Sequence, residues 1–199
     1  MGISVKRPRP DPPGRIAIAE AARRLFRDKG YASTTIEAIA VEAGYAVQTV
    51  YFHFKTKAAI VQYLVDRMRA ETITPAFEHS MQDQPAQSRL GALAKVARRT
   101  AELWWDVYEV LHSASQSDDA LGALVTDMEG GRLYGQRLLA KALAARRELG
   151  PGIDVATATD VIWALASEDT YRRLVVERKW SPSRYEAWLS QCLSRELLG

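Results

Sequence analysis

The chain is poor in the residues that build disulfides and metal sites. Cys192 is its only cysteine among 199 residues, and its three histidines do not form a close pair. An intrachain disulfide is therefore impossible, and a reducing cytoplasm is the expected compartment. No run approaches the roughly 18 apolar residues that a membrane span needs, and no apolar leader follows Met1. We predict a cytoplasmic protein with no metal and no membrane partner.

The sequence also lacks the patterns on which common enzymes depend. It contains no glycine-rich phosphate loop, no paired metal ligands and no nucleophile with an evident general base. We therefore expect neither an enzyme nor a bound cofactor.

Charge is present but unevenly distributed. Residues 1–57 contain ten Lys and Arg against five Asp and Glu, whereas the remaining chain contains 17 against 19. This asymmetry favours a polyanion as the partner of the first segment and a different partner for the second. Within it, residues 1–14 are basic and rich in proline, which predicts a flexible arm that either lies along phosphates or stays in solvent.

Apolar residues recur with helical periodicity throughout, and no convincing alternating strand is present. Thr34 with Glu37 predicts a capping box at the second helix, and Gly44 permits a left-handed turn before the third. Thr56 and Ser181 are the expected caps of two later helices. We predict an all-α fold of about nine helices. Their expected ranges are about 15–29, 34–43, 46–53, 56–81, 86–114, 117–130, 131–148, 155–178 and 182–198, with a break allowed before Pro75.

Residues 34–57 carry the most informative pattern. Two short helices joined at Gly44 match the helix-turn-helix that enters a DNA major groove. The third helix is expected to expose Val47, Gln48 and Thr49 at its first turn. An amide such as Gln48 pairs with adenine, and the methyl group of Thr49 can contact a thymine methyl. These three residues are the predicted base-reading set.

The same segment also carries side chains that end in polar atoms. Tyr51 and His53 carry polar atoms on rigid rings, which suits phosphate oxygens. Lys57 lies in the first turn of the fourth helix, where a cation opposes the helix dipole unless a phosphate binds there. The alternatives are a core aromatic for Tyr51, an ordinary surface histidine for His53 and a solvated charge for Lys57.

These motifs resemble the N-terminal signature of TetR/AcrR-type transcriptional regulators. The resemblance covers about the first 60 residues and extends to two short segments near the C-terminus. The matching segments are Ala21-Ala22-Arg23-Arg24-Leu25-Phe26, Gly30-Tyr31, Thr35-Ile36-Glu37-Ala38-Ile39-Ala40, Ala43-Gly44, Thr49-Val50-Tyr51-Phe52-His53-Phe54, Lys57, Tyr171-Arg172-Arg173-Leu174 and Trp180-Ser181-Pro182.

The resemblance implies a homodimer with a three-helix DNA-binding head and a larger C-terminal domain for a small effector. It implies that Gln48 and Thr49 approach bases, while Thr35, Tyr51, His53 and Lys57 hold phosphates. Two positions depart from the family: Ala46 stands where a capping serine is common, and Tyr45 replaces an aliphatic residue. The expected domains are an arm over 1–14, a head over 15–57 and an effector and dimerisation domain over 58–199.

Aromatic residues crowd the C-terminal part. Consecutive tryptophans on a helix point about 100° apart, so Trp104 and Trp105 cannot be equally buried in one seam. We predict an aromatic effector pocket, and plain core packing is the alternative for each member. Its expected lining is Tyr63, Trp104, Trp105, Tyr108, His112, Met128 and Tyr134.

The last two expected helices carry apolar residues on more than one face. Such helices are buried on two sides, so two from each subunit would form a symmetric four-helix bundle. A core within one chain is the alternative. The predicted dimer contacts are Leu165, Leu174, Val175, Trp188, Leu189, Cys192 and Leu193.

The sequence as a whole favours a ligand-responsive repressor that binds a palindromic DNA operator as a homodimer. The alternative is a small-molecule-binding or interaction module whose DNA-binding head is vestigial.

Overall fold

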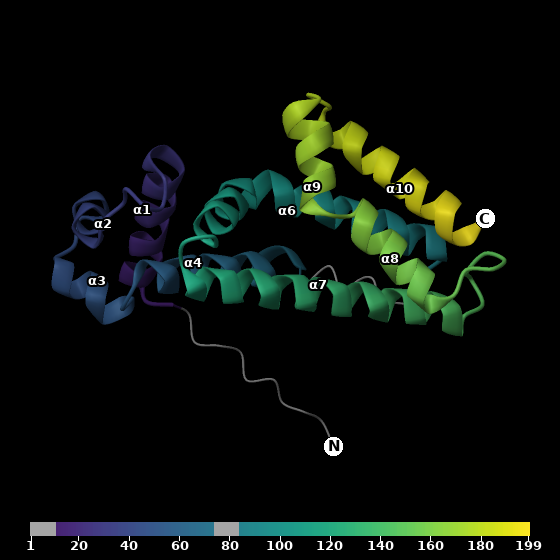
Figure 1. Cartoon of the computed structure of the whole chain (residues 1–199), viewed down its shortest axis with the longest axis horizontal. Coiled ribbons are helices and arrows are strands. Elements are labelled where there is room, and N and C mark those ends of the chain that lie inside the picture. Colours follow the sequence, from purple (N-terminus) through teal and green to yellow (C-terminus); the bar gives the residue numbers. More distant parts are fainter. Residues whose placement is uncertain (1–10, 74–83) are drawn as a thin grey trace, which may run out of the picture.

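The computed structural model describes residues 11–73 and 84–199, and the predicted all-α fold is confirmed there, with nine α-helices and no strand. Helices α1 to α3 form a head at one end, α4 leads out of it, and α6 to α10 form the body (Figure 1). The helices are α1 (Pro13–Lys29), α2 (Ile36–Ala43), α3 (Val47–His53), α4 (Lys57–Met68), α6 (Ala86–Ala114), α7 (Asp119–Ala145), α8 (Val155–Leu165), α9 (Glu168–Tyr171) and α10 (Pro182–Leu198), with π-helical segments η1 (Arg69–Ile73) and η2 (Arg172–Glu177).

The cap of α2 is one residue later than predicted. Thr35, not Thr34, is the N-cap, and its Oγ1 accepts a hydrogen bond from the amide of Ala38 at 3.2 Å. Thr34 is buried instead, and its hydroxyl donates to the carbonyl oxygen of Gly30 at 2.8 Å. Two adjacent threonines can both cap a helix by sequence, and the burial of Thr34 against the end of α1 decides between them.

The turn between α2 and α3 follows the prediction. Gly44 has φ 72° and ψ 30°, the left-handed conformation that glycine adopts at least cost. Ala46 is the N-cap of α3 and supplies no side-chain hydrogen bond. By contrast, Thr56 and Ser181 cap α4 and α10 as expected, accepting from the amides of Ala59 and Arg184.

The predicted helix over 56–81 is described only as far as Ile73: α4 ends at Met68 and passes into η1, and residues 74–81 of the predicted range lie outside the described residues. Three other predicted helix ranges are wrong. The glycine pair 130–131 does not interrupt α7, which runs unbroken from Asp119 to Ala145. The predicted helix over 155–178 is divided, because Ser167 caps a new helix by accepting from the amide of Thr170.

Two apolar clusters organise the packing. The first joins the inner faces of α1 to α4 to the adjoining ends of α6 and α7, with Val50 and Phe54 from the head meeting Trp104 and Leu111 from the body in one cluster. The second lies between α6, α7, α8 and α10. The head is therefore not packed independently, and α4 contributes to both parts of the molecule.

Adding a cap to α3 should stabilise the protein. Ala46 has the extended backbone of an N-cap but no acceptor, so Ala46→Ser is expected to raise the free energy of unfolding by about 0.5–2 kcal/mol. Urea denaturation followed by circular dichroism measures this. Ser181→Ala is the matched control, and it should lower the same free energy because the amide of Arg184 loses its acceptor. A loss from both substitutions would contradict the assignment of Ala46.

Candidate DNA interface and ligand cavity

The α3 helix presents one face outward. Val50 and Phe54 anchor it in the first cluster, whereas Gln48, Tyr51 and Phe52 are exposed. The side chain of Phe52 is 83% exposed, an unusual placement for a large apolar ring. A helix held by one apolar side with its amide and rings outward has the shape that fits a major groove.

The three predicted base-reading residues occupy the first turn of α3. Gln48 is exposed, while Val47 and Thr49 are half-buried beside it. Val47 packs against the first cluster, so part of its surface is already covered. Gln48 is thus the member of this set with the greatest freedom to reach a base edge.

The predicted phosphate contacts lie around α3 on neighbouring elements. Thr35 is exposed at the N-cap of α2, and Tyr51 is 49% exposed on α3. His53 is half-buried, with its ring centroid 5.2 Å from that of Phe52. It also lies against the start of α1, where a Cβ built on Gly14 would be 3.3 Å from His53 Nε2 and 3.4 Å from the hydroxyl of Tyr45. The unusual Tyr45 therefore packs beside one of the predicted phosphate contacts.

Lys57 is engaged within the head. Its Nζ donates to the carbonyl oxygen of Tyr31 at 2.7 Å and lies 4.5 Å from the centroid of the Tyr31 ring. Burial lowers the pKa of Lys57, and the carboxylate of Asp118 opposes that change. A longer contact, at 3.5 Å, reaches the carbonyl oxygen of Ala32. An ammonium has three donors, so these two bonds leave one donor for a phosphate at the start of α4.

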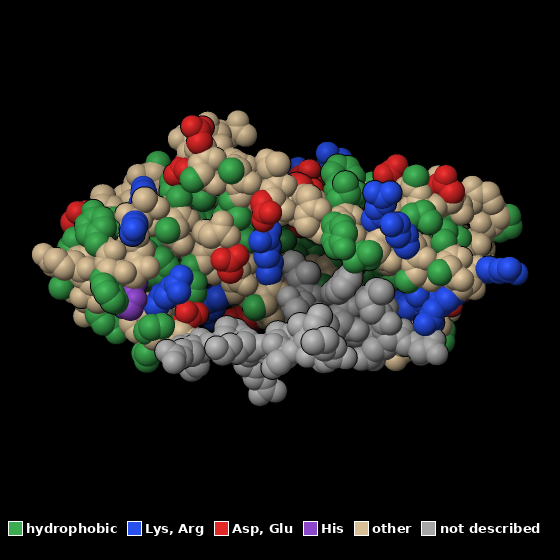
Figure 2. Space-filling view, turned by 90° about the horizontal axis from the view of Figure 1, so that it is seen from below, with side chains coloured by type: hydrophobic (Ala, Val, Ile, Leu, Met, Phe, Trp, Pro, Cys, Tyr) green, Lys and Arg blue, Asp and Glu red, His purple; other side chains and the backbone are tan. Residues whose placement is uncertain are grey.

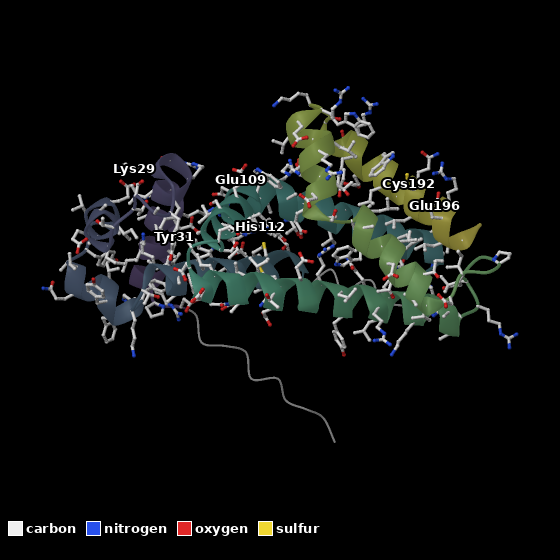
Figure 3. All side chains as sticks on the ribbon, viewed as in Figure 1. Lys29, Tyr31, Glu109, His112, Cys192 and Glu196 are labelled. Atoms are coloured by element: carbon white, nitrogen blue, oxygen red, sulfur yellow. The ribbon has the colours of Figure 1, made fainter. Side chains whose placement is uncertain are left out.

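Tyr31 also connects the head to the body. Its hydroxyl donates to Asp118 at 2.8 Å, and burial is the main cause that raises the pKa of this hydroxyl, so it stays protonated. Asp118 is the N-cap of α7 and accepts from the amides of its first turn. Figure 3 shows Tyr31 where the head meets the start of α7. The same boundary contains the ion pair between Arg23 and Asp106, at 2.7 Å.

Two exposed residues were given no role in the sequence-based site. Phe52 stands four positions after Gln48 and therefore shares its helix face, a spacing that was visible in the sequence. Lys55 is exposed in the turn between α3 and α4, and no acid among the described residues pairs with it. Both lie on the predicted DNA side of the head.

The body encloses a cavity of about 440 Å³. Its walls come from η1, α6, α7, α9 and α10, and the face drawn in Figure 2 is hollowed near its centre. Leu93, Val96, Ala97 and Leu139 contribute apolar surface, and Tyr171 and Tyr185 also line it. A largely apolar cavity of this volume is typical of a small-molecule site.

The cavity includes only two of the seven predicted lining residues. Tyr108 and Met128 line it, whereas the other five side chains lie elsewhere. Trp104 is 2% exposed beneath the guanidinium of Arg23 in the first cluster, and Trp105 packs against the Tyr171 ring. The unequal burial expected of the two tryptophans is present, but neither lines the cavity.

The remaining three predicted lining residues are also accounted for by local packing. Tyr63 packs on Phe54 and donates to Asp11 at 3.0 Å, at the junction with the head. His112 and Tyr134 are exposed on α6 and α7, and Figure 3 shows His112 on α6. An aromatic residue on a helix was therefore not sufficient to predict a cavity-lining residue, because the direction in which each side chain points depends on how the helices pack.

The charged groups at the cavity are paired. Arg132 forms ion pairs with Glu129 at 2.7 Å and with Glu168 at 3.8 Å, and Arg69 pairs with Asp127 at 2.8 Å. Burial raises the pKa of Tyr108 well above its ordinary value, and the nearby Glu168 carboxylate adds to the effect. Tyr108 therefore remains a neutral hydroxyl.

Glycine and small polar residues form part of the wall that sequence reasoning overlooked. Gly131 and Gly135 line the cavity from α7, and a Cβ added at either would meet nothing within 4 Å. Thr100 and Gln136 line it from α6 and α7. Of the glycine pair that suggested a weak helix, Gly131 thus leaves open space in the cavity wall.

The predicted dimer contacts fall into two groups. Leu189 and Leu193 are fully buried in the second cluster of their own subunit, so they have no surface to offer a partner. Leu165, Leu174, Val175, Trp188 and Cys192 are half-buried on α8, η2 and α10, and Figure 3 shows Cys192 on α10. A contact with a second subunit would therefore use the second group.

Two further properties concern only residues 11–73 and 84–199. No helix there is long and apolar enough to cross a membrane. Within the same ranges, no group of three or more His, Cys, Asp or Glu side chains is placed to hold a metal ion.

Comparison with known proteins agrees with this geometry. Residues 18–64, which span most of the head and the start of α4, match the model of bacterial regulatory proteins of the tetR family. The probable HTH-type transcriptional regulator ArpR of Pseudomonas putida is 31% identical over 161 residues, covering 75% of each chain.

Solved structures share the fold. A structure described as a SmeT-triclosan complex has a TM-score of 0.78 at 21% identity and covers 94% of this chain and 92% of its own. A regulator from Saccharomonospora viridis in complex with choline has a TM-score of 0.75 at 19% identity, covering 93% and 97%. By its match to the tetR-family model and its relationship to ArpR, this chain belongs to the TetR family of DNA-binding transcriptional regulators.

Proposed function

We propose that the protein is a ligand-responsive repressor that binds a near-palindromic operator as a homodimer. The exposed face of α3 is the observation that carries this proposal, since its amide and rings are held outward by Val50 and Phe54. Two such helices would enter successive major grooves roughly 34–36 Å apart. The protein would act in the cytoplasm, where bacterial DNA lies.

The residue roles follow from exposure and chemistry. Val47, Gln48 and Thr49 would meet base edges, with Gln48 the main reader. Thr35, Tyr51, His53 and Lys57 would hold phosphates around them. Phe52 is added here as an apolar contact for a thymine methyl, because its ring is exposed one turn beyond Gln48.

The dimer would form through α8, η2 and α10. Leu165, Leu174, Val175, Trp188 and Cys192 retain exposed surface there and would pair with the same residues of a partner in an isologous interface. Leu189 and Leu193 would support this surface from inside the subunit.

The cavity would receive the effector. One wall of the cavity is α7, and the N-cap of that helix, Asp118, accepts a hydrogen bond from the hydroxyl of Tyr31. The carbonyl oxygen of Tyr31 in turn accepts a hydrogen bond from Lys57. A ligand that favours a different position of α7 would thus favour a different position of the head, and would shift the population away from DNA. Two structural neighbours are described as complexes with triclosan and with choline, which supports a small molecule as the effector.

The relatives are transcriptional regulators, which are generally not enzymes. We accordingly propose that the bound ligand is unchanged. If selection from random duplexes enriched no sequence, the vestigial-head alternative would replace the repressor.

Two substitutions in the head should separate base reading from phosphate binding. Gln48→Ala is expected to reduce discrimination at one base pair by about 1–3 kcal/mol, whereas Lys57→Ala should weaken all duplexes and lower the salt dependence by about one phosphate contact. Fluorescence anisotropy with enriched and scrambled duplexes, over a salt series, measures both. Lys95→Ala, which removes an exposed ammonium from α6, is the control. Exchanged outcomes for Gln48 and Lys57 would refute the roles.

A charge in the proposed interface should dissociate the dimer. Val175→Asp would place an unpaired carboxylate from each subunit in the symmetric interface. It is expected to weaken the free energy of dimerisation by at least about 2 kcal/mol. Analytical ultracentrifugation gives the subunit mass, and circular dichroism confirms folding. Leu133→Asp, at an exposed position of α7, is the matched control and should leave the dimer intact. A dimer that survives Val175→Asp would move the interface elsewhere.

Filling the cavity should block ligand entry. Gly135→Leu would project into open space, so the affinity for the neutral fluorescent probe N-phenyl-1-naphthylamine is expected to fall at least about fivefold. Gly130→Leu makes the same change on the same helix at an exposed position that does not line the cavity, and should have no effect. Equal effects of both would show that the probe binds outside the cavity.

A further inference from the structure

We infer that the cavity selects an uncharged, largely apolar ligand that carries one hydroxyl or amide group, and that Thr100 and Gln136 recognise that group from opposite helices. This inference rests on the proposed function, because it names the ligand class of the same cavity. It depends on unpaired polar atoms of Thr100 and Gln136 and on the charge balance of the wall. Arg132 Nε also lacks a hydrogen-bond partner there, but it lies 3.8 Å from a carboxylate oxygen of Glu168.

Thr100 is the first observation. It is 5% exposed, it lines the cavity from α6, and its Oγ1 has no hydrogen-bond partner among the described residues. Three other helical threonines differ from it. Thr72, Thr126 and Thr159 each donate to the carbonyl oxygen four residues earlier, at 2.7, 3.1 and 2.6 Å. That internal bond is the usual means by which a buried helical threonine satisfies its hydroxyl, and Thr100 lacks it although the residue lines the cavity.

Gln136 is the second observation, from the facing helix. It is also 5% exposed and lines the cavity from α7, and its Oε1 has no donor within the part of the chain that the structure describes. Buried polar atoms nearly always find a partner, and those left without one point to a missing water or ligand. The amide oxygen accepts, so the ligand must donate to it, whereas the threonine hydroxyl can either donate or accept. A hydroxyl or a primary amide on the ligand satisfies both atoms.

The charged residues set the net charge of the ligand. Arg69 and Arg132 are the cationic side chains of the described wall, and both are engaged by carboxylates of Asp127, Glu129 and Glu168. An anionic ligand would meet more acids than bases and would have to break an ion pair to gain a counter-charge. A cationic ligand would likewise find each carboxylate engaged. A buried charge without a partner is strongly disfavoured, so an uncharged molecule fits best.

Four naphthalene derivatives provide the test with the full-length protein. 1-Naphthol carries the apolar body and one hydroxyl, naphthalene lacks the hydroxyl, and 1-naphthoate and protonated 1-naphthylmethylamine carry opposite charges. Equilibrium dialysis at neutral pH is expected to rank 1-naphthol first, with both charged compounds at least about tenfold weaker. Equal or tighter binding of either charged compound, or no binding of 1-naphthol up to about 1 mM, would overturn the inference.

Two shape-conserving variants locate the polar contact. Thr100→Val and Gln136→Met should each weaken 1-naphthol about three- to tenfold while changing naphthalene less than twofold, because only the hydroxyl loses its partner. Thr159→Val is the matched control, since Thr159 is equally buried but lies outside the cavity and bonds within its own helix. Circular dichroism verifies folding. An unchanged ratio of the two affinities in both cavity variants, or the same change in Thr159→Val, would refute the assignment.

DNA binding separates this inference from the proposed function. If 1-naphthol binds with the expected pattern but leaves affinity for an enriched duplex unchanged, the recognition by Thr100 and Gln136 stands and the ligand response fails. If 1-naphthol releases DNA equally from the native protein and from both cavity variants, the ligand response stands and the polar recognition falls.

Discussion

The apolar cluster that joins the head to the body is the constraint on which the rest of the structure depends. Val50 and Phe54 anchor α3 in it, which forces Gln48, Tyr51 and Phe52 to the outside. The same cluster contains Trp104 and Leu111 of α6 and the first apolar residues of α7. The proposed DNA-binding surface therefore depends on packing that also includes two helices of the cavity.

Polar contacts between the head and the body accompany this shared apolar core. Arg23 reaches Asp106, and Tyr31 reaches Asp118 at the first turn of α7. Single ion pairs at a half-exposed boundary contribute little to stability, but they define how the head sits on the body. Because Lys57 binds the carbonyl oxygen of Tyr31, a shift of α7 has a short route to a proposed phosphate contact. That chain of contacts is a continuous path along which a shift of α7 would reach the head.

The cavity shows how composition can mislead about structure. Glycines 130 and 131 suggested a weak point in a helix, yet α7 is continuous, since neighbours on both sides hold it in place. The open space beside Gly131 and Gly135 instead makes part of the cavity. Conversely, Trp104 suggested a pocket because it is large and aromatic, and it is core, covered by the guanidinium of Arg23.

The sequence by itself determined the helical class, the order of the head helices, the turn at Gly44 and the family, because these depend on local periodicity, capping and a motif in register. It also predicted that α3 exposes Gln48. Only the tertiary structure decided that Thr35 rather than Thr34 caps α2, that Leu189 and Leu193 lie inside the subunit, and that Thr100 and Gln136 face a common cavity. The physical reason is that the sequence of a helix with apolar residues on several faces does not show which face packs against which neighbour. That orientation depends on how α6, α7 and α10 pack together.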